Sequence, residues 1–566
     1  MKSGLKASHI LIVSLAAVLP LLPFVDKAFH IDDTLFIWTA RQILERPWDF
    51  YGFTGNWFSS ENTAHTFIKN PPLTSYYIAF IALFTGFSER ALHIAFLVPA
   101  LFAALGTYVL AFRFTRMPLA AALAAVATPA FLVSSTNIMC DVMLLAFWNW
   151  AMFFWIRGLD KGRGLDLAIG GFLIALAALT KYFGVSLIPL FAAYSVFQGK
   201  KGLKALAYLL IPVAALAGYQ FYTQYMYGRG LLFDAADYAT GIKVFSAMPQ
   251  HERVFTGVVF AGGSIIAALF LIPSLFGLRA VAAGIALAAA GAAYAYLKGS
   301  FEEEDIVLFK PAFGWGFIAQ MAVYWAAGAG VLFLAVSDFM KRKDAGSVLL
   351  LLWVAGTFFF AVFVNWSINV RSILPMVPAV SILIMRAAEG RGALRAYLPV
   401  IPAFAFSFFI TQADYNFANS ARTAARLISD GYSGEGALWF QGHWGFQYYM
   451  ESAGAVPIDT KGSVIRKGSM VAIPYNNYGL KRFPDRLDKT GMVDSFPPQY
   501  VETMPQGGGA GFYAHQWGPM PFMLFPPKGE TYVVFRMNED WVLPRDLLAE
   551  DMPQRAGFPV RPRGTP

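Results

Sequence analysis

The feature that most constrains this chain is a series of long apolar segments between about residues 9 and 411. About 20 consecutive apolar residues cross a bilayer as a helix, so the sequence predicts thirteen spans. Only 14% of the residues are charged, whereas a soluble protein carries about 25%. We therefore predict a polytopic α-helical membrane protein, with spans near residues 9–25, 91–112, 118–135, 141–157, 166–180, 183–198, 205–225, 255–277, 280–297, 312–336, 347–365, 372–387 and 396–411.

Charged loops predict the orientation of these spans. Basic residues gather in short loops such as 113–116 and 200–204, and the acidic loops 26–61 and 234–252 alternate with them. Because basic loops stay in the cytoplasm, we predict an inside N-terminus and an outside C-terminus. The alternation requires residues 166–198 to form a hairpin of two short helices. The net charge of +9 then reflects topology, and we expect no nucleic-acid partner, which would need a basic groove with exposed aromatic residues.

Two segments are predicted to lie outside the cytoplasm. Residues 26–90 form a long first loop of a membrane domain that covers residues 1–411, and residues 412–566 form a C-terminal domain. Apolar, strand-like stretches at 437–440 and 531–535, with a helix-like stretch between them, predict a small α/β fold for that domain.

Two sequence features limit the chemistry of the outer segments. The single cysteine, Cys140, excludes an internal disulfide. Residues Gly507–Phe512 are rich in glycine but lack the strand–turn–helix context of a nucleotide-binding loop. We expect a flexible loop there.

Acidic residues mark the outer ends of two predicted spans. Asp32 and Asp33 follow the first span, and Asp141 begins the fourth. One acid could cap the following helix, but a second unpaired charge at a membrane is costly. The predicted topology places all three carboxylates on the outer face at a similar depth. Carboxylates that converge in this way can act as a base for a hydroxyl group or hold a divalent cation.

Four motifs occur in order along the chain: Asp32-Asp33, KNPPLTSYY at 69–77, Asp141 with ALAALTKY at 175–182, and NVRSILP at 369–375. With this order and topology, residues 9–411 resemble the integral-membrane glycosyltransferases of the GT-C fold. The similar superfamily contains protein O-mannosyltransferases and lipid A aminoarabinose or galacturonic acid transferases. Leu35 and Asn70 depart from the aminoarabinose branch, which commonly has an arginine and a lysine at these places.

The resemblance implies a donor sugar on a polyprenyl phosphate and an extracytoplasmic acceptor hydroxyl on lipid A or lipopolysaccharide, a polysaccharide or a protein. It also implies a bacterial inner-membrane enzyme whose site and C-terminal domain face the periplasm. Phosphate is a good leaving group, so an inverting direct displacement needs a base and cations but no general acid. Asp32 is the expected base. Asp33 and Asp141 are expected to position the acceptor, tune the base or hold a cation.

The remaining site residues are expected around these acids. The predicted ligands of the donor phosphate are Lys181, Arg371 and Lys69. The predicted substrate-lining residues are Asn70, His65 and Tyr76. A divalent cation, if bound, would use Asp32, Asp141 and His65, although no ligand spacing is diagnostic of a metal.

Two other classes of protein fit parts of the pattern. A secondary transporter or lipid flippase would also have many spans and charges near the membrane, but its charges are expected at the midplane between repeated halves. A non-catalytic scaffold with a periplasmic recognition domain would not need the acidic pair. The glycosyltransferase is therefore the preferred interpretation.

Overall fold

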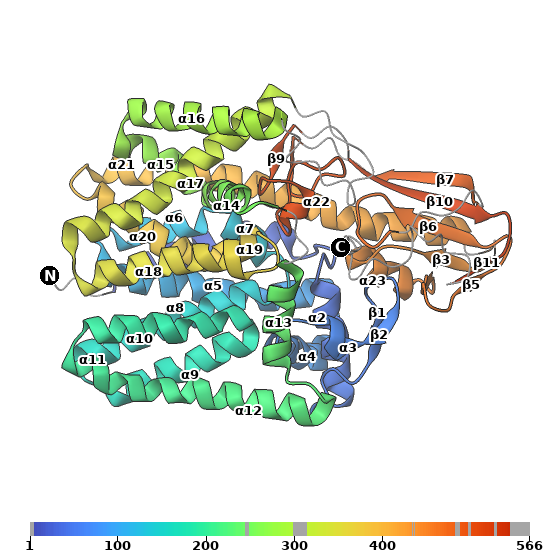
Figure 1. The fold of residues 1–566 in the computed structure, drawn as a ribbon, viewed down its shortest axis with the longest axis horizontal. Helices are drawn as coiled ribbons and strands as arrows, with labels where there is room; N and C mark the ends of the chain where they lie inside the picture. Colours follow the sequence, from blue (N-terminus) through green and yellow to red (C-terminus); the bar gives the residue numbers. More distant parts are fainter. Residues whose placement is uncertain are drawn as a thin grey trace, which may run out of the picture.

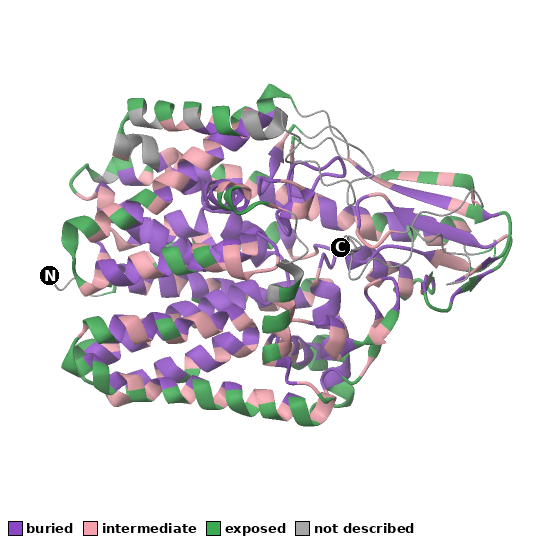
Figure 2. Ribbon diagram, viewed as in Figure 1, coloured by how far each residue is buried: buried purple, intermediate pink, exposed green. Residues whose placement is uncertain are grey.

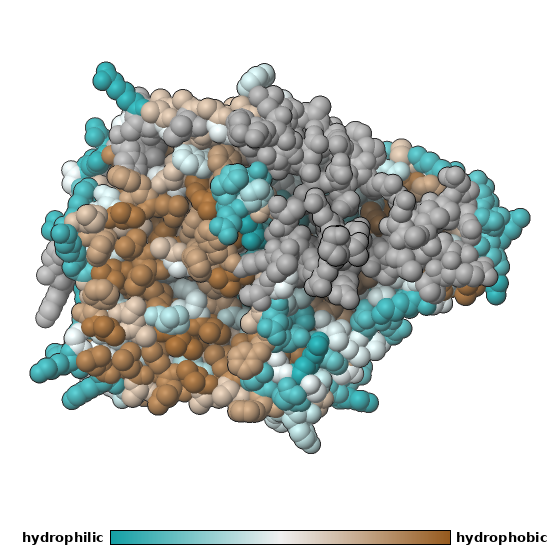
Figure 3. Space-filling model, in the orientation of Figure 1, coloured by the Kyte–Doolittle hydropathy of each residue, from teal (hydrophilic) through white to brown (hydrophobic). Residues whose placement is uncertain are grey.

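The computed structural model describes residues 5–243, 248–297, 314–432, 434, 436–480, 487–495, 500–525 and 529–543. Long helices run side by side through one half of the molecule, and a β-rich region forms the other half (Figure 1). Short helices lie where the two halves meet. Apolar side chains cover the helical half and polar ones gather at its free end, as expected of a bundle in lipid (Figure 3).

Eight helices of the described residues are long and apolar enough to cross a membrane, or nine if one bent pair counts as a single span. The bent pair is α6 (Pro118–Val126) and α7 (Pro129–Ser135), which meet at 61°. The break follows from Pro129 and its neighbour Thr128, whose hydroxyl accepts a hydrogen bond from the Phe131 N–H at 3.2 Å and caps the new helix.

The predicted hairpin at 166–198 is formed by two short helices. They are α9 (Gly164–Thr180) and α10 (Leu187–Phe197), joined by the 3₁₀ turn η2 (Tyr182–Ser186). Gly184 makes the turn possible, because a Cβ atom there would lie 2.4 Å from the Ala177 carbonyl carbon.

The number of thirteen spans stays a prediction, since several of the expected segments are short or divided. The segment predicted at 255–277 is divided at Ile265 into α14 (Gln250–Ser264) and α15 (Ile266–Phe276). The other helices of this half, with their connecting turns, are α1 (Ala7–Val18), η1 (Leu19–Phe24), α5 (Glu89–Phe114), α8 (Asp141–Lys161), α11 (Lys200–Ala205), η3 (Leu206–Leu209), α12 (Leu210–Tyr227), α16 (Leu278–Leu297), α17 (Trp315–Arg342), α18 (Ala345–Phe359), the π-helical turn η4 (Phe360–Val364), α19 (Val370–Ile373), η5 (Leu374–Met376), α20 (Val377–Ala388) and α21 (Ala393–Tyr397).

The first loop folds at the end of the bundle that faces the β-rich region. It contains α2 (Asp33–Glu45), β1 (Thr54–Asn56), β2 (Glu61–Thr63), α3 (Ala64–Phe67) and α4 (Leu73–Thr85). Helix α13 (Leu231–Lys243) runs across the direction of the long helices beside this loop (Figure 1). These elements surround the functional residues described below.

The last long helix, α22 (Val400–Tyr432), joins the two halves. It runs without interruption through the predicted boundary between residues 411 and 412. Its far end packs against β7 (Leu487–Ser495) and β10 (Glu530–Met537) of the C-terminal region. One continuous helix therefore leads from the membrane domain into the C-terminal region.

The C-terminal region has the expected α/β composition. Strands β3 (Leu438–Phe440), β4 (Val456–Pro457) and β6 (Met470–Pro474) join β7 and β10 in a five-stranded sheet of order β4-β3-β6-β10-β7. Strand β10 pairs antiparallel with β6 and β7, and β3 pairs parallel with β6 and β4. Helix α23 (Trp444–Ser452) lies where the sequence predicted a helix. The remaining strands and turn are β5 (Val464–Ile465), β8 (Val501–Glu502), η6 (His515–Trp517), β9 (Met523–Leu524) and β11 (Trp541–Val542).

Buried residues run through the centre of the bundle and continue into the junction with the C-terminal region (Figure 2). The junction is held by hydrogen bonds between the first loop and the C-terminal region. The Thr34 hydroxyl donates to the Trp444 carbonyl at 3.0 Å, and the Gln447 amide donates to the Asn56 carbonyl at 2.7 Å. The site therefore lies between two regions that are packed against each other.

Candidate active site

The acidic pair lies in a strained turn between the first span and α2. Ile31 has φ +46°, which is rare for a β-branched residue. The turn is closed by Asp33, whose carboxylate accepts a hydrogen bond from the His30 N–H at 2.9 Å. Asp32 stands at the N-cap position of α2, but its side chain makes no capping hydrogen bond. Capping of α2 therefore does not account for the carboxylate of Asp32.

Asp32 instead takes part in a row of four charged side chains. Arg371 Nη1 lies 2.9 Å from Asp32 Oδ2 and 3.9 Å from Asp141 Oδ2. Lys181 Nζ lies 2.6 Å from Asp141 Oδ1. The side chains of Asp32 and Lys181 keep 24% and 18% of their surface exposed, whereas Asp141 keeps only 3%. Four of the six residues predicted as acids or phosphate ligands thus meet at one place.

The local structure around Arg371 fixes its position. Arg371 lies in the one-turn helix α19, whose N-cap residue Asn369 accepts a hydrogen bond from the Ser372 N–H at 2.9 Å. The preceding N–H, of Val370, donates to the Phe512 carbonyl of the C-terminal region at 3.0 Å. Within the described structure, Arg371 Nε and Asp141 Oδ2 have no hydrogen-bond partner. The row of charges therefore retains hydrogen-bonding capacity for a ligand.

Asp33 has a different environment from Asp32. Its side chain is fully buried, and its second oxygen accepts a hydrogen bond from the Ile138 N–H at 3.1 Å. Burial raises the pKa of Asp33 to about 7. Asp33 therefore connects the turn after span one to the loop that precedes Asp141, and it does not face the row of charges.

Lys69 does not join the row. Its Nζ lies 2.5 Å from Asp234 Oδ2 and 5.2 Å from the centre of the Tyr238 ring, both on α13. Asn70 lies nearer the acids, with its Oδ1 3.8 Å from the Cys140 sulfur. The Tyr76 hydroxyl donates to the Pro47 carbonyl, which makes Tyr76 a tether within the first loop.

His65 also lies apart from the acids. Its ring stacks on Tyr227 with centroids 5.2 Å apart, and its Nε2 lies 3.3 Å from the Thr63 hydroxyl. In the described part of the chain, no three His, Cys, Asp or Glu side chains are grouped as a metal site. Asp32 and Asp141 pair with Arg371 and Lys181, and His65 stacks on Tyr227, so the three expected cation ligands are not brought together.

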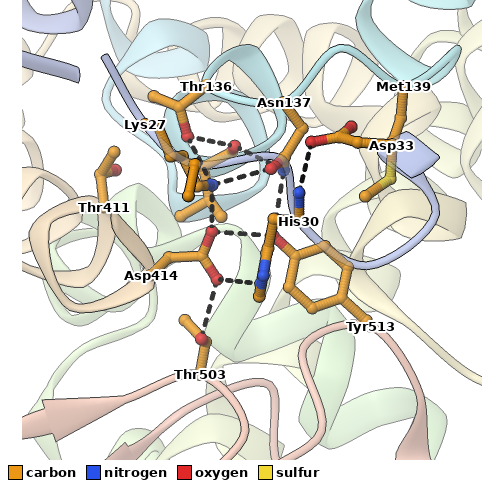
Figure 4. Close-up of polar contacts among 12 residues, drawn as sticks. Lys27, His30, Asp33, Thr136, Asn137, Met139, Thr411, Asp414, Thr503 and Tyr513 are labelled. Carbon is orange, nitrogen blue, oxygen red and sulfur yellow. Dashed lines mark hydrogen bonds and ion pairs between the residues drawn. The ribbon is translucent and has the colours of Figure 1, made fainter. Parts of the chain in front are cut away.

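Behind the acids lies a second cluster that the sequence analysis did not find. Lys27 Nζ lies 2.6 Å from Asp414 Oδ2, and both side chains are fully buried. The hydroxyls of Thr503 and Tyr513 each donate to Asp414 at 2.8 Å, and Lys27 donates to Asn137 at 2.7 Å (Figure 4). The sequence signals for this cluster were a lysine one residue after an apolar run, behind Asp26, and an acid, Asp414, near the end of another.

The glycine-rich loop is buried, contrary to the expectation of a flexible loop. All residues from Glu502 to His515 are buried. Gly508 and Gly509 have φ values of +76° and +99°, which glycine adopts without strain. The Phe512 N–H donates to the Thr503 carbonyl at 2.9 Å, so the segment folds back on itself. This compact turn brings Tyr513 into the membrane domain.

Arg253 is a further cation that the sequence analysis did not select. It is 7% exposed, and its Nε and Nη2 have no partner in the described residues. The helix that carries it, α14, packs against α19, the helix that carries Arg371. His515 Nδ1 accepts from the Ile368 N–H at 3.1 Å, and its Nε2 has no partner in the part of the chain that the structure describes. An arginine at the outer end of a span opposes the positive-inside trend, and this signal could have identified Arg253.

Comparison with known proteins identifies one sequence family. Residues 69–220 match the profile of the family described as dolichyl-phosphate-mannose-protein mannosyltransferase. The matched segment contains the motif at 69–77, Asp141 and Lys181, while the acidic pair and Arg371 lie outside it. A search of curated proteins finds no match.

Three solved structures match this chain at low similarity. The oligosaccharyltransferase of Archaeoglobus fulgidus, tethered to an acceptor peptide, has 14% identity and a TM-score of 0.48; the match covers 81% of this chain and 64% of that one. This chain thus spans less than two thirds of the archaeal protein. ArnT from Cupriavidus metallidurans, bound to undecaprenyl phosphate, has 13% identity, a TM-score of 0.42 and coverages of 94% and 98%. The S. cerevisiae Pmt1–Pmt2 complex, bound to the sugar donor, has 14% identity, a TM-score of 0.31 and coverages of 40% and 34%.

The profile match and the motifs agree on the same group of proteins. The match begins at Lys69, the first residue of the second motif, and it includes both elements of the third. The resemblance predicted from the motifs is therefore confirmed for residues 69–220, which match the mannosyltransferase family model.

Proposed function

We propose that this protein is a glycosyltransferase that moves a sugar from a polyprenyl-phosphate donor to a hydroxyl group of an extracytoplasmic acceptor. The proposal places it in the bacterial inner membrane, with its site on the periplasmic side. The observation that carries the proposal is the meeting of Asp32, Asp141, Arg371 and Lys181 at the end of the bundle next to the C-terminal region. The family match supports a transferase and gives no support to a transporter or flippase.

The geometry suits a direct displacement. Arg371 and Lys181 neutralise the departing phosphate, and Arg253 adds a guanidinium whose Nε and Nη2 have no partner among the described residues. When the phosphate attracts Arg371, Asp32 loses its ion pair and becomes a stronger base for the acceptor hydroxyl. Attack from the side opposite the phosphate inverts the sugar's anomeric carbon. Asp141 stays beside Lys181 and holds it in place.

The acceptor is proposed to be an envelope glycolipid, polysaccharide or protein. Its hydroxyl would approach from the junction between the first loop and the C-terminal region, where Asp32 retains exposed surface. Burial of the carboxylates and cations in a partly closed site strengthens their effect on the reacting groups.

The proposal is tested with purified protein in detergent micelles, where no ion gradient exists. Undecaprenyl-phosphate sugars are supplied with total envelope extract, and free undecaprenyl phosphate and labelled acceptor are measured. The wild-type protein is expected to release both products. If it consumes none of the supplied lipid-linked sugars, the transferase is excluded for them and a transporter has to be tested in proteoliposomes.

Two lysine variants sharpen this test. Lys181→Ala is expected to reduce turnover about 10- to 100-fold, because the phosphate and Asp141 both lose the positive charge that stabilises them. Lys69→Ala is the matched control, since Lys69 pairs with Asp234 on α13. It is expected to stay within about threefold of wild type, as is usual when a lost ion pair lies outside a reacting centre. Equal losses in both variants would contradict the placement of the phosphate.

A further inference from the structure

The segment between Glu502 and Phe522 belongs to the C-terminal region, yet one of its side chains touches the row of charges. The ring centre of Tyr513 lies 5.5 Å from the guanidinium carbon of Arg371. At this separation, the π-face of an aromatic ring attracts a cation, most strongly where water is excluded. Tyr513 is 2% exposed, so the contact is dry.

The hydroxyl group of Tyr513 fixes the place of the ring. It donates to Asp414 Oδ2 at 2.8 Å and accepts from Asn137 Nδ2 at 3.0 Å. Asp414 is itself held by Lys27 and by Thr503 (Figure 4). A tyrosine with both hydroxyl partners buried cannot turn without leaving polar groups unpaired. The ring is therefore a fixed surface beneath Arg371.

The opposite side of Arg371 is also defined. Its Nη1 lies 2.9 Å from the Met139 sulfur as well as from Asp32. Met139, which contacts Arg371, and Asn137, which donates to Tyr513, belong to the same short loop. This loop therefore positions both side chains. The guanidinium is thus aimed at Asp32 by contacts from three parts of the chain.

We propose that Tyr513 is a positioning residue for the transfer reaction, which holds the Arg371 guanidinium between Asp32 and the donor phosphate. The C-terminal region consequently completes the active site. The inference rests on the proposed function and assigns to the C-terminal region a direct part in it. Tyr513 acts through Arg371 and does not contact the reacting atoms.

The test is a double-mutant cycle between Tyr513 and Arg371. Tyr513→Leu removes the aromatic face and is expected to raise the donor KM and to lower kcat/KM roughly 10-fold or more. Tyr513→Phe keeps the face and is expected to retain most of the kcat/KM. In an Arg371→Ala background, Tyr513→Leu is expected to have little further effect, because the group it positions is absent.

A matched control separates positioning from general packing. Trp517 lies in the same segment, donates to Asn476 at 2.9 Å and packs on Trp444, whereas the ring over Arg371 is that of Tyr513. Trp517→Leu is expected to lower the melting temperature while its effect on kcat/KM adds independently to that of Arg371→Ala. The same additive behaviour for Tyr513→Leu would overturn the proposal, as would a kcat/KM equal to wild type.

A binding measurement keeps the test independent of turnover. The affinity for undecaprenyl phosphate is measured for the purified wild-type protein and for each variant. Tyr513→Leu is expected to weaken it about 10-fold, and Tyr513→Phe to leave it nearly unchanged. If the wild-type protein binds this lipid but transfers no sugar, the proposed function fails while the role of Tyr513 stays measurable. If Tyr513→Leu binds as the wild type does, the inference fails alone.

Discussion

Two clusters of charged side chains lie close together in this protein, and they differ in how completely their charges are satisfied. Lys27 and Asp414 have no exposed side-chain surface, and every oxygen of Asp414 accepts a hydrogen bond. Asp32 and Arg371 keep 24% and 12% of their side-chain surface exposed, and Arg371 Nε lacks a partner in the described residues. A satisfied cluster is a structural element, whereas an unsatisfied one beside solvent can bind a ligand.

The largest effect is expected for Asp32→Asn, which tests the unsatisfied cluster around Arg371. The substitution keeps the size of the side chain but removes the base, and loss of a general base costs about 10²- to 10⁴-fold in rate. Because Asp32 makes no capping hydrogen bond, the melting temperature should change little. Turnover at saturating donor checks the first expectation and thermal unfolding the second. Wild-type turnover in a folded variant would show that the cluster around Arg371, like that of Lys27 and Asp414, is structural.

The next effect concerns the satisfied cluster of Lys27 and Asp414. Asp414→Asn leaves Lys27 charged and buried without a counter-ion, and breaking such a pair costs about 3–5 kcal/mol of stability. The double variant Lys27→Met/Asp414→Leu removes both charges and should recover much of that loss. Melting temperatures of the two proteins in detergent give the comparison. If the double variant is as unstable as the single one, the cluster does more than balance two buried charges.

A smaller effect is expected for Arg371→Lys. Lysine keeps the charge but loses the planar group that reaches Asp32 and Asp141 together. The donor KM should rise about 10-fold or more. Arg422→Lys is a suitable control, because Arg422 pairs with Glu89 outside the site. Similar losses of donor use in the two variants would show a general effect of replacing outer arginines.

The smallest effect is a change in the pH dependence of stability. The pKa of Asp33 is raised by burial to about 7, above the value of about 3.9 for an unfolded chain. The folded protein therefore binds the proton more tightly, and its stability falls as the pH rises from about 4 to 7. His30, whose pKa is lowered by burial to about 3, gives the opposite slope below about pH 6.5.

Asp33→Asn isolates this contribution. The melting temperature of wild type relative to this variant should fall between pH 4.5 and 7.5, because the variant lacks the titrating group. A difference that stays constant with pH would show that Asp33 keeps its charge throughout this range.

The sequence singled out four residues of the candidate site, Asp32, Asp141, Lys181 and Arg371, because each left a local signal. The acidic pair followed an apolar run, and Arg371 lay at the outer end of a span, against the positive-inside trend. Lys181 was marked by the break within the hairpin. Such signals depend only on neighbouring residues and on membrane thickness, so they can be found without a structure.

The residues that the sequence analysis missed depend on contacts between distant parts of the chain. Tyr513 and Asp414 are 99 residues apart, and Lys27 and Asp414 are 387 apart. The burial of the glycine-rich loop follows from its packing against the membrane domain, for which its composition gives no signal. The pairing of Lys69 with Asp234 gave no sequence signal for a similar reason, since Asp234 lies on α13, 165 residues further along the chain.

The long connection between Asp414 and Tyr513 has a consequence for biosynthesis. At about 5–20 residues per second, the ribosome needs roughly 5–20 seconds to make the intervening chain. During this interval Lys27 and Asp414 are already synthesised, while Thr503 and Tyr513 are not. The nascent protein therefore inserts its spans before the last partners of the buried pair exist. Folding of the late segment acts as a maturation step, after which the newly made protein acquires its final arrangement around Arg371.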